Sequence, residues 1–141
     1  QHLSPVPTEG LNLTQLGRFL ALTAQNPHPT LLALAGTAVK DLDPFRAPAT
    51  AGDLARRRQS NLSARQDALL VDWGYPYVLN EFRFHITLTG KLSTDNASAV
   101  QSALQPALSA LKKPFCLEAL SLVGEDDNGR FHEISRFGLS G

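Results

Sequence analysis

The chain has 141 residues, of which 43% are hydrophobic and 18% charged, a composition typical of one folded domain and not of a disordered chain. Thirteen basic residues balance thirteen acidic ones, so the overall charge favours neither DNA nor a membrane surface as a partner. No apolar run reaches the roughly 18 residues of a transmembrane helix, and the single cysteine, Cys116, excludes an intrachain disulfide and is typical of a reducing cytoplasm.

The first 25 residues predict a loop followed by two strand segments. Residues 1–10 contain Pro5 and Pro7 and are expected to form a loop or to be disordered. Residues 11–25 alternate apolar and polar positions on both sides of Gly17, which predicts a tight turn or a bulge at this glycine. The chain begins at Gln1 and contains no methionine, so we expect it to be a fragment, with residues 1–141 forming a single, N-terminally incomplete domain.

Helical patterns dominate the middle of the chain. Residues 30–45 have apolar positions at helical spacing, and residues 45–61 predict a connection with about two helical turns. Ser63 begins a second helix with a capping box, and Gly74 ends it. A third helix is expected over residues 96–111, with a kink or an early break at Pro106.

Three further strands complete the predicted fold. They cover residues 82–92, 113–125 and 130–139, and the turn at 127–129 joins the last two as an antiparallel hairpin. Helices and strands are intermixed and the final pair is antiparallel, so we predict an α+β fold, with an antiparallel sheet and packed helices.

The strand predicted over residues 82–92, FRFHITLTGKL, has an unusual pattern. One face carries apolar residues, and the other carries Arg83, His85, Thr87 and Thr89. Residues two apart on one face lie about 6.5 to 7 Å apart, so an imidazole, a hydroxyl and a guanidinium stand in a row. Such a row is suited to holding a phosphate, although it also fits an ordinary solvated face.

Other polar and aromatic residues of the sequence also have a structural interpretation. His132 lies in H-E-I-S, and on a strand this spacing puts Ser135 on the opposite face, so a surface histidine is favoured there. The run Arg56–Arg58 fans around a helix and is interpreted as a solvated face. Tyr75 and Tyr77 fit either packing at a corner or a stacking wall for a base or sugar. The sequence contains no G-x-x-x-x-G-K-[ST] or dinucleotide-binding motif.

Several segments together resemble a domain family encoded among phosphonate-metabolism genes, which belongs to the two-histidine phosphoesterase superfamily. The resemblance rests on WGYPYVLNEFRFHITLTGKL, DPFRAP, ARRR, FLALTAQ and SRFGL, and covers nearly the whole chain. It implies a bilobal fold in which each lobe supplies one H-x-[ST] strand to a central cleft. One histidine is then the general base and the other the general acid, with no metal and no cofactor.

By this resemblance, His85 and Thr87 form the second H-x-T motif, and the chain corresponds to the last two thirds of the family domain. No earlier H-x-T motif precedes His85. The expected function is hydrolysis of a cyclic phosphate or phosphodiester, with a small phosphorylated substrate or nucleotide held by Arg83 and by the weaker candidates Arg46, Tyr75 and Tyr77. This chain alone is expected to be a weak catalyst.

Two further expectations follow from the single H-x-T motif. The alternative function is a module that binds a phosphorylated ligand or nucleotide without turning it over. An incomplete lobe would also leave sheet edges and apolar surface uncovered, so we expect a dimer or a companion fragment.

Overall fold

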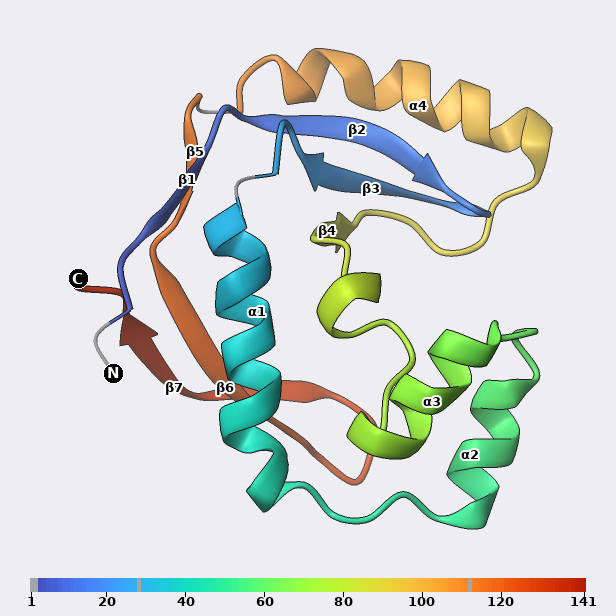
Figure 1. Cartoon of the computed structure of the whole chain (residues 1–141). Helices are drawn as coiled ribbons and strands as arrows, with labels where there is room; N and C mark the ends of the chain where they lie inside the picture. Colours follow the sequence, from blue (N-terminus) through green and yellow to red (C-terminus); the bar gives the residue numbers. More distant parts are fainter. Residues whose placement is uncertain (1–2, 28, 112) are drawn as a thin grey trace.

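The computed structural model describes residues 3–27, 29–111 and 113–141. Helices and small antiparallel sheets are mixed along the chain, so the predicted α+β class is confirmed (Figure 1). The elements, in chain order, are β1 (Val6–Thr8), β2 (Leu11–Leu16), β3 (Phe19–Ala24), α1 (Pro29–Leu42), the 3-10 helix η1 (Asp43–Phe45), α2 (Ala51–Arg58), α3 (Ala64–Trp73), the 3-10 helix η2 (Leu79–Glu81), β4 (His85–Thr87), α4 (Thr94–Leu108), β5 (Phe115–Leu117), β6 (Ala119–Glu125) and β7 (Phe131–Gly138).

The described strands form three separate antiparallel sheets where the sequence predicted one. The sheet that carries the candidate site has the order β2-β3-β4, while β1 pairs with β5 and β6 pairs with β7. The predicted break at Gly17 is confirmed, because Leu16 pairs with Phe19 and Gly17 has a φ of 58°. Glycine adopts this left-handed conformation without steric cost, so it suits a two-residue hairpin turn.

The loop predicted for residues 1–10 is wrong in its middle. Val6–Thr8 form β1, in which Val6 pairs with Leu117 and Thr8 with Phe115. Pro7 is compatible with this strand because β1 has a partner on one side only, where a missing N–H is tolerated if it faces away. Val6 and Thr8 are buried and Pro7 is exposed, so packing of alternate side chains holds the segment in place.

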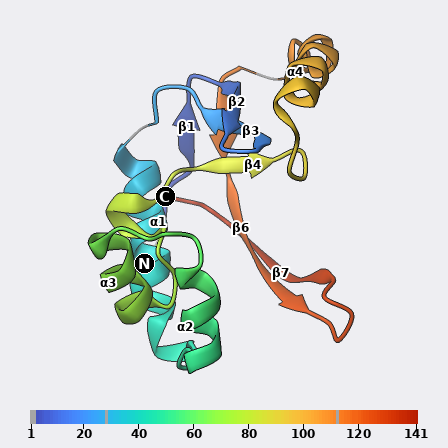
Figure 2. The same ribbon diagram turned by 90° about the vertical axis from the view of Figure 1, so that its right-hand side faces the viewer.

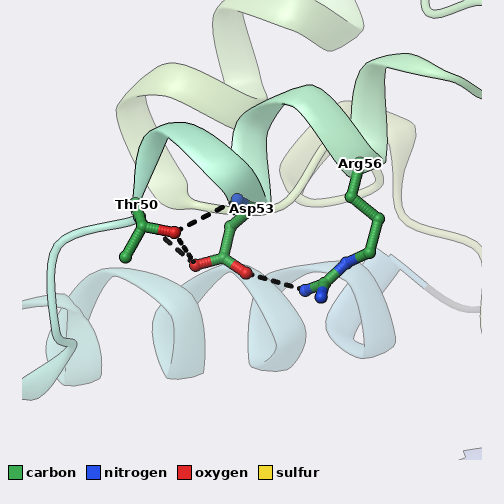
Figure 3. Close-up of polar contacts among 3 residues, drawn as sticks. All are labelled: Thr50, Asp53 and Arg56. Atoms are coloured by element: carbon green, nitrogen blue, oxygen red, sulfur yellow. Dashed lines mark hydrogen bonds and ion pairs between the residues drawn. The ribbon is translucent and has the colours of Figure 1, made fainter.

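Helix α3 begins and ends at the residues that the capping signals indicate. Ser63 accepts a hydrogen bond from the Gln66 N–H and Gln66 reaches back to the Ser63 N–H, while Gly74 follows α3 in the left-handed conformation. A second capping box, which the sequence analysis did not predict, begins α2, where the Thr50 hydroxyl accepts from the Asp53 N–H at 3.2 Å (Figure 3). Such a cap contributes about 1 kcal/mol.

Helix α4 differs from its expected bounds. It begins at Thr94 after the N-cap Ser93, and it ends at Leu108, two residues beyond Pro106. The helix continues through Pro106 and ends three residues earlier than predicted. Proline removes the bond to the carbonyl four residues before it, so its effect falls on the preceding turn.

The polar-faced strand is much shorter than residues 82–92. Only His85–Thr87 pair regularly with β3, and residues 79–81 form η2. The pairing becomes irregular after Leu88, whose N–H still donates to the Leu20 carbonyl at 2.9 Å. The Leu20 N–H then donates to the Thr89 side-chain hydroxyl at 3.0 Å. A side-chain acceptor therefore replaces the backbone carbonyl that a longer ladder would have used, and the strand stops.

Two regions of the molecule differ sharply in burial. Val6, Leu31 and Leu34 form a core with partly buried neighbours from β3, β5, β6 and the segment before β4. The β6–β7 hairpin instead extends away from the helices α1–α3 (Figure 2). Its apolar residues include Leu122, Phe131 and Phe137, which are 53%, 71% and 59% exposed. The register places Leu122 and Phe137 on one face and Phe131 on the other, because the pairing shifts between Leu122 and Val123. Within the described residues, no helix is long and apolar enough to span a membrane.

Replacing Thr89 by valine tests how β4 is held. The change removes the acceptor of the Leu20 N–H, and Leu20 is fully buried. An unsatisfied buried donor costs about 1–3 kcal/mol, and we expect the free energy of unfolding in urea to fall by that amount. The Thr89→Ser variant keeps the hydroxyl and should lose less than half as much. Equal losses in the two variants would contradict this role of the hydroxyl.

The exposed apolar residues of the hairpin lead us to expect self-association. Exposed apolar surface drives association between chains. Light scattering should give a mass above the 15.2 kDa of one chain, and the double variant Phe131→Ser/Phe137→Ser, which changes one exposed ring on each face, should shift the mass towards that value. A wild-type protein that stays monomeric at high concentration would show that the hairpin does not drive association.

Candidate functional site

His85 and Thr87 lie side by side on one face of the short strand β4, and both are exposed. Their position is set by pairing with β3, in which His85 is opposite Thr23 and Thr87 is opposite Ala21. Directly opposed residues on antiparallel strands have their Cβ atoms about 4.5 to 5.5 Å apart and share a face. The imidazole therefore has a hydroxyl on its own strand and another on the neighbouring strand.

The hydroxyls of β2 and β3 extend this polar face beyond the residues that the sequence analysis selected. The Thr14 and Thr23 hydroxyls are hydrogen-bonded to each other at 2.7 Å, and both threonines are half-buried. Sequence reasoning missed them because the alternation in residues 11–25 indicated only strands. The signal was present, however, since Thr14 and Thr23 occupy polar positions within that alternation.

The His85 ring is held by two contacts. The centroid of the His85 ring is 6.0 Å from that of the Phe19 ring. Ala21, which is fully buried, lies on β3 between Phe19 and the residue opposite His85. The Nδ1 atom is 2.8 Å from the Arg83 carbonyl oxygen. A carbonyl can only accept, so Nδ1 carries the proton in the neutral ring and Nε2 keeps a lone pair. An imidazole in this tautomer can take a proton at Nε2.

A cleft of about 300 Å³ lies beside this face. Its lining includes Thr23 and Arg83 together with the apolar side chains of Leu31, Phe82 and Phe84. Thr23 is opposite His85, and Arg83 supplies the carbonyl that binds the imidazole. The cleft is thus mostly apolar, and its polar lining residues Arg83 and Thr23 adjoin His85.

Tyr75 and Tyr77 form a separate group after α3. Both rings are exposed, by 41% and 40%, whereas Pro76 and Val78 between and after them are buried. The alternation turns the two rings outwards, where they meet edge to face with their centroids 5.7 Å apart. Packing at the corner is therefore done by Pro76 and Val78. Among the described residues, no contact joins either tyrosine to His85.

The Arg46 side chain is bound both to η1 and to the end of α3. Its Nε donates to Asp43 Oδ1 at 2.8 Å and its Nη2 donates to the Asp72 carbonyl at 3.2 Å. These contacts place the guanidinium beside the end of α3, where it lies 2.9 Å from the position of a Cβ added at Gly74. The charge of Arg46 is already paired, so Arg46 fits the geometry of a brace between η1 and α3.

His132 lies in the β6–β7 hairpin, in a different sheet from β4. Its Nε2 is 2.8 Å from Asp126 Oδ2. Hydrogen bonds from the Arg130 N–H and from His132 lower the pKa of Asp126, so this carboxylate accepts and His132 donates. Because the pKa of Asp126 is depressed in the folded protein, these hydrogen bonds stabilise the fold at pH values above the pKa of Asp126 in the unfolded chain. That stabilisation is lost as the pH falls through the pKa of Asp126 in the folded protein. The surface-histidine interpretation of His132 fits this geometry.

The structure places three of the six predicted site residues together around β4 and the other three at the end of α3. Arg83, His85 and Thr87 share the β4 segment and border the cleft or the polar face. Arg46, Tyr75 and Tyr77 lie around the end of α3. Within the described part of the chain, no three His, Cys, Asp or Glu side chains are grouped as metal ligands would be.

The two described histidines should show opposite tautomers. His85 donates from Nδ1 to a carbonyl, and His132 donates from Nε2 to a carboxylate. Long-range nitrogen–proton correlation spectra, recorded above the pH at which the rings are charged, distinguish the two forms directly. We expect the Nδ1–H form for His85 and the Nε2–H form for His132. An Nε2–H form at His85 would show that the ring is not oriented by Arg83.

Comparison with known proteins gives one family and two curated relatives. The family described as "Protein of unknown function (DUF1045)" matches residues 1–132. A protein of Janthinobacterium sp. (strain Marseille) named ribose 1,5-bisphosphate phosphokinase PhnN is 39% identical over 129 residues, which are 87% of this chain and 28% of the relative. A protein of the same name from Laribacter hongkongensis (strain HLHK9) is 34% identical over 132 residues, covering 92% of this chain and 30% of the relative.

The chain therefore spans less than a third of the length of each of these relatives. No solved structure gives a significant match.

Proposed function

This chain belongs to the DUF1045 family, and on that premise we propose that it carries half of the catalytic site of a metal-independent phosphoesterase acting on a cyclic phosphate or phosphodiester. The observation that carries the proposal is the orientation of His85, whose Nδ1 is bound to the Arg83 carbonyl while Thr87 and Thr23 flank the ring. A role in phosphonate metabolism, which the sequence resemblance implies, is supported by the two relatives named PhnN.

The proposed chemistry uses proton transfer at the His85 Nε2 atom. An imidazole can accept a proton at one ring nitrogen while it donates a hydrogen bond from the other. The neighbouring Thr87 hydroxyl donates a hydrogen bond to a phosphoryl oxygen. Arg83 lines the adjacent cleft, and its guanidinium offsets the negative charge that develops in the transition state. The apolar wall of the cleft receives the organic part of the substrate.

A two-histidine mechanism needs a second proton-transfer group. His132 is the other described histidine, but it lies on the β6–β7 hairpin with Asp126 as its partner. We infer that the second group comes from outside the described residues. A polypeptide that lacks this second group is a poor catalyst, because one general acid or base is typically worth about 10²- to 10⁴-fold in rate.

The kinase activity in the name of the two relatives is not proposed for this segment. That name describes proteins more than three times as long as the matched segment, and the present sequence contains no G-x-x-x-x-G-K-[ST] phosphate-binding motif. The second candidate function is a module that binds a phosphorylated ligand without hydrolysis. It is favoured by the position of His132, which leaves His85 without a second histidine among the described residues.

Replacing His85 by alanine tests the catalytic proposal. The measurement is hydrolysis of a panel of nucleoside cyclic phosphates by the longest natural polypeptide that carries this sequence. We expect His85→Ala to lower kcat by at least about 10²-fold because proton transfer is lost, and Thr87→Val to lower it less. The matched control, His132→Ala, should retain the wild-type rate.

Wild-type turnover in a correctly folded His85→Ala variant would exclude the catalytic role. Saturable binding of the same compounds, with no turnover by the unsubstituted polypeptide, would favour the binding module instead.

A further inference from the structure

Three consecutive arginines on α2 have three different partners. Arg56 Nη2 is 2.8 Å from Asp53 Oδ1 (Figure 3), and Arg58 donates to both oxygens of Asp67 at 2.6 and 3.1 Å. The Arg57 guanidinium instead lies over the Tyr75 ring, 4.6 Å from its centroid. Successive residues on a helix point about 100° apart, which is why neighbours in the sequence reach such different surroundings.

Arg57 is the arginine of this run that forms no salt bridge within the described residues. Among the described residues, no carboxylate lies within ion-pair distance of its guanidinium, and the residue is exposed. A guanidinium held over an aromatic ring by the attraction between its charge and the ring face still has N–H groups available to a further acceptor. Those N–H groups match the paired oxygens of a phosphate.

Buried neighbours hold the two tyrosines near Arg57 in place. Tyr75 and Tyr77 are exposed on either side of Pro76, which is fully buried, and the buried Val78 follows. The two rings meet edge to face, so the second ring adds a flat apolar surface beside the stacked pair. We call Arg57, Tyr75 and Tyr77 the Arg57 cluster.

Arg46 does not offer the same chemistry, although it lies beside the same end of α3. Its guanidinium is bound to Asp43 and to the Asp72 carbonyl. An incoming anion would have to displace a carboxylate there, whereas at Arg57 it would meet an unpaired cation. The Arg57 cluster is thus the place around α2 and α3 where a free positive charge and exposed rings adjoin.

We propose that the Arg57 cluster binds a phosphate monoester carried on a ring group, with the phosphate on the Arg57 N–H groups and the ring group against the tyrosines. The ring group is a nucleobase or a sugar, since the flat face of a base stacks on tyrosine and the C–H face of a sugar packs on it. The cluster is built from α2 and the segment after α3, while His85 lies on β4. The proposal therefore does not depend on His85 being catalytic.

Titration of the complete chain tests this binding. The readout is the fluorescence of Trp73, the only tryptophan of the chain, which precedes the two tyrosines; it is excited outside the absorption band of the base. The probes are adenosine monophosphate, ribose 5-phosphate, adenosine and ribose at one ionic strength.

We expect saturable binding of at least one phosphorylated probe. Binding of its unphosphorylated counterpart should be weaker by about tenfold or more, as expected for loss of hydrogen bonds to a charged group. Comparable binding of both phosphorylated probes assigns the ring contact to the sugar, and binding of the nucleotide alone assigns it to the base. Saturation by neither phosphorylated probe would overturn the proposal.

The matched variants are Arg57→Gln and Arg56→Gln, which remove the same charge from adjacent positions of one helix. Arg57→Gln should weaken binding about tenfold or more, and Arg56→Gln by less than threefold. Tyr75→Phe keeps the ring and should change little, whereas Tyr75→Ala should weaken binding. If Arg57→Gln does not fold by circular dichroism, Arg57→Lys keeps the charge without the planar fork and should bind more weakly than wild type. Equal effects of the Arg56 and Arg57 variants would overturn the proposal, because they would indicate only general charge attraction.

A His85→Ala variant separates this proposal from the catalytic one. Its affinity for the phosphorylated probe should equal that of the wild type. If His85→Ala abolishes binding while Arg57→Gln does not, the ligand occupies the β4 site, and the Arg57 proposal is wrong while the catalytic proposal stands. If binding survives His85→Ala and hydrolysis also survives it, the catalytic proposal fails and the Arg57 proposal stands.

Discussion

The antiparallel pairing of β3 with β4 is the constraint on which the candidate site depends. It is only three residues long, and it joins Ala21, Leu22 and Thr23 to Thr87, Ile86 and His85. A shift of one residue would turn His85 and Thr87 to the opposite face of the sheet. The register is supported beyond the strand by Leu20, whose carbonyl accepts from Leu88 and whose N–H donates to Thr89. A buried β3 therefore positions an exposed β4.

The same face of the sheet combines apolar packing with polar chemistry. Ala21 is small enough for the His85 and Phe19 rings to approach each other above it. The ring is then oriented by the Arg83 carbonyl, so His85 is restrained before any ligand arrives. Restraint of this kind lowers the entropy lost when a reacting group must be aligned. Thr23 and Thr14 supply hydroxyls to this face from strands far from His85 in the sequence.

The helical part of the molecule is organised by local polar contacts. Capping boxes begin α2 and α3, and the Arg58–Asp67 pair connects the two helices. These groups are exposed, and such ion pairs typically contribute 0 to about 1 kcal/mol each. Arg57, which precedes Arg58 on α2, lies over Tyr75 instead. A charge run that indicated a solvated face thus contains two paired cations and one stacked on an aromatic ring.

Local signals in the sequence were sufficient for much of this protein. Ser63, Gln66 and Gly74 specified a helix because caps act through neighbouring backbone groups, and Gly17 specified a turn because of its φ. The alternation around His85 and Thr87 was enough to place both on one face. Residues 6–8 and 82–92 were mispredicted, since the first gains a partner in β5, about 110 residues away, and the second ends where a Thr89 side chain replaces a backbone acceptor.

Only the tertiary structure decided which groups became neighbours. The contacts of His85 with Thr23 and Phe19, and of Arg57 with Tyr75, join segments separated in the sequence. Their formation depends on sheet register and on the packing of α2 against α3, neither of which a periodic pattern encodes. The sequence by itself determined the residue types, the helix ends and the face of each strand, because these depend on local backbone geometry. The structure alone decided the pairing of charges, which leaves Arg46 bound to Asp43 and Arg57 without a carboxylate among the described residues.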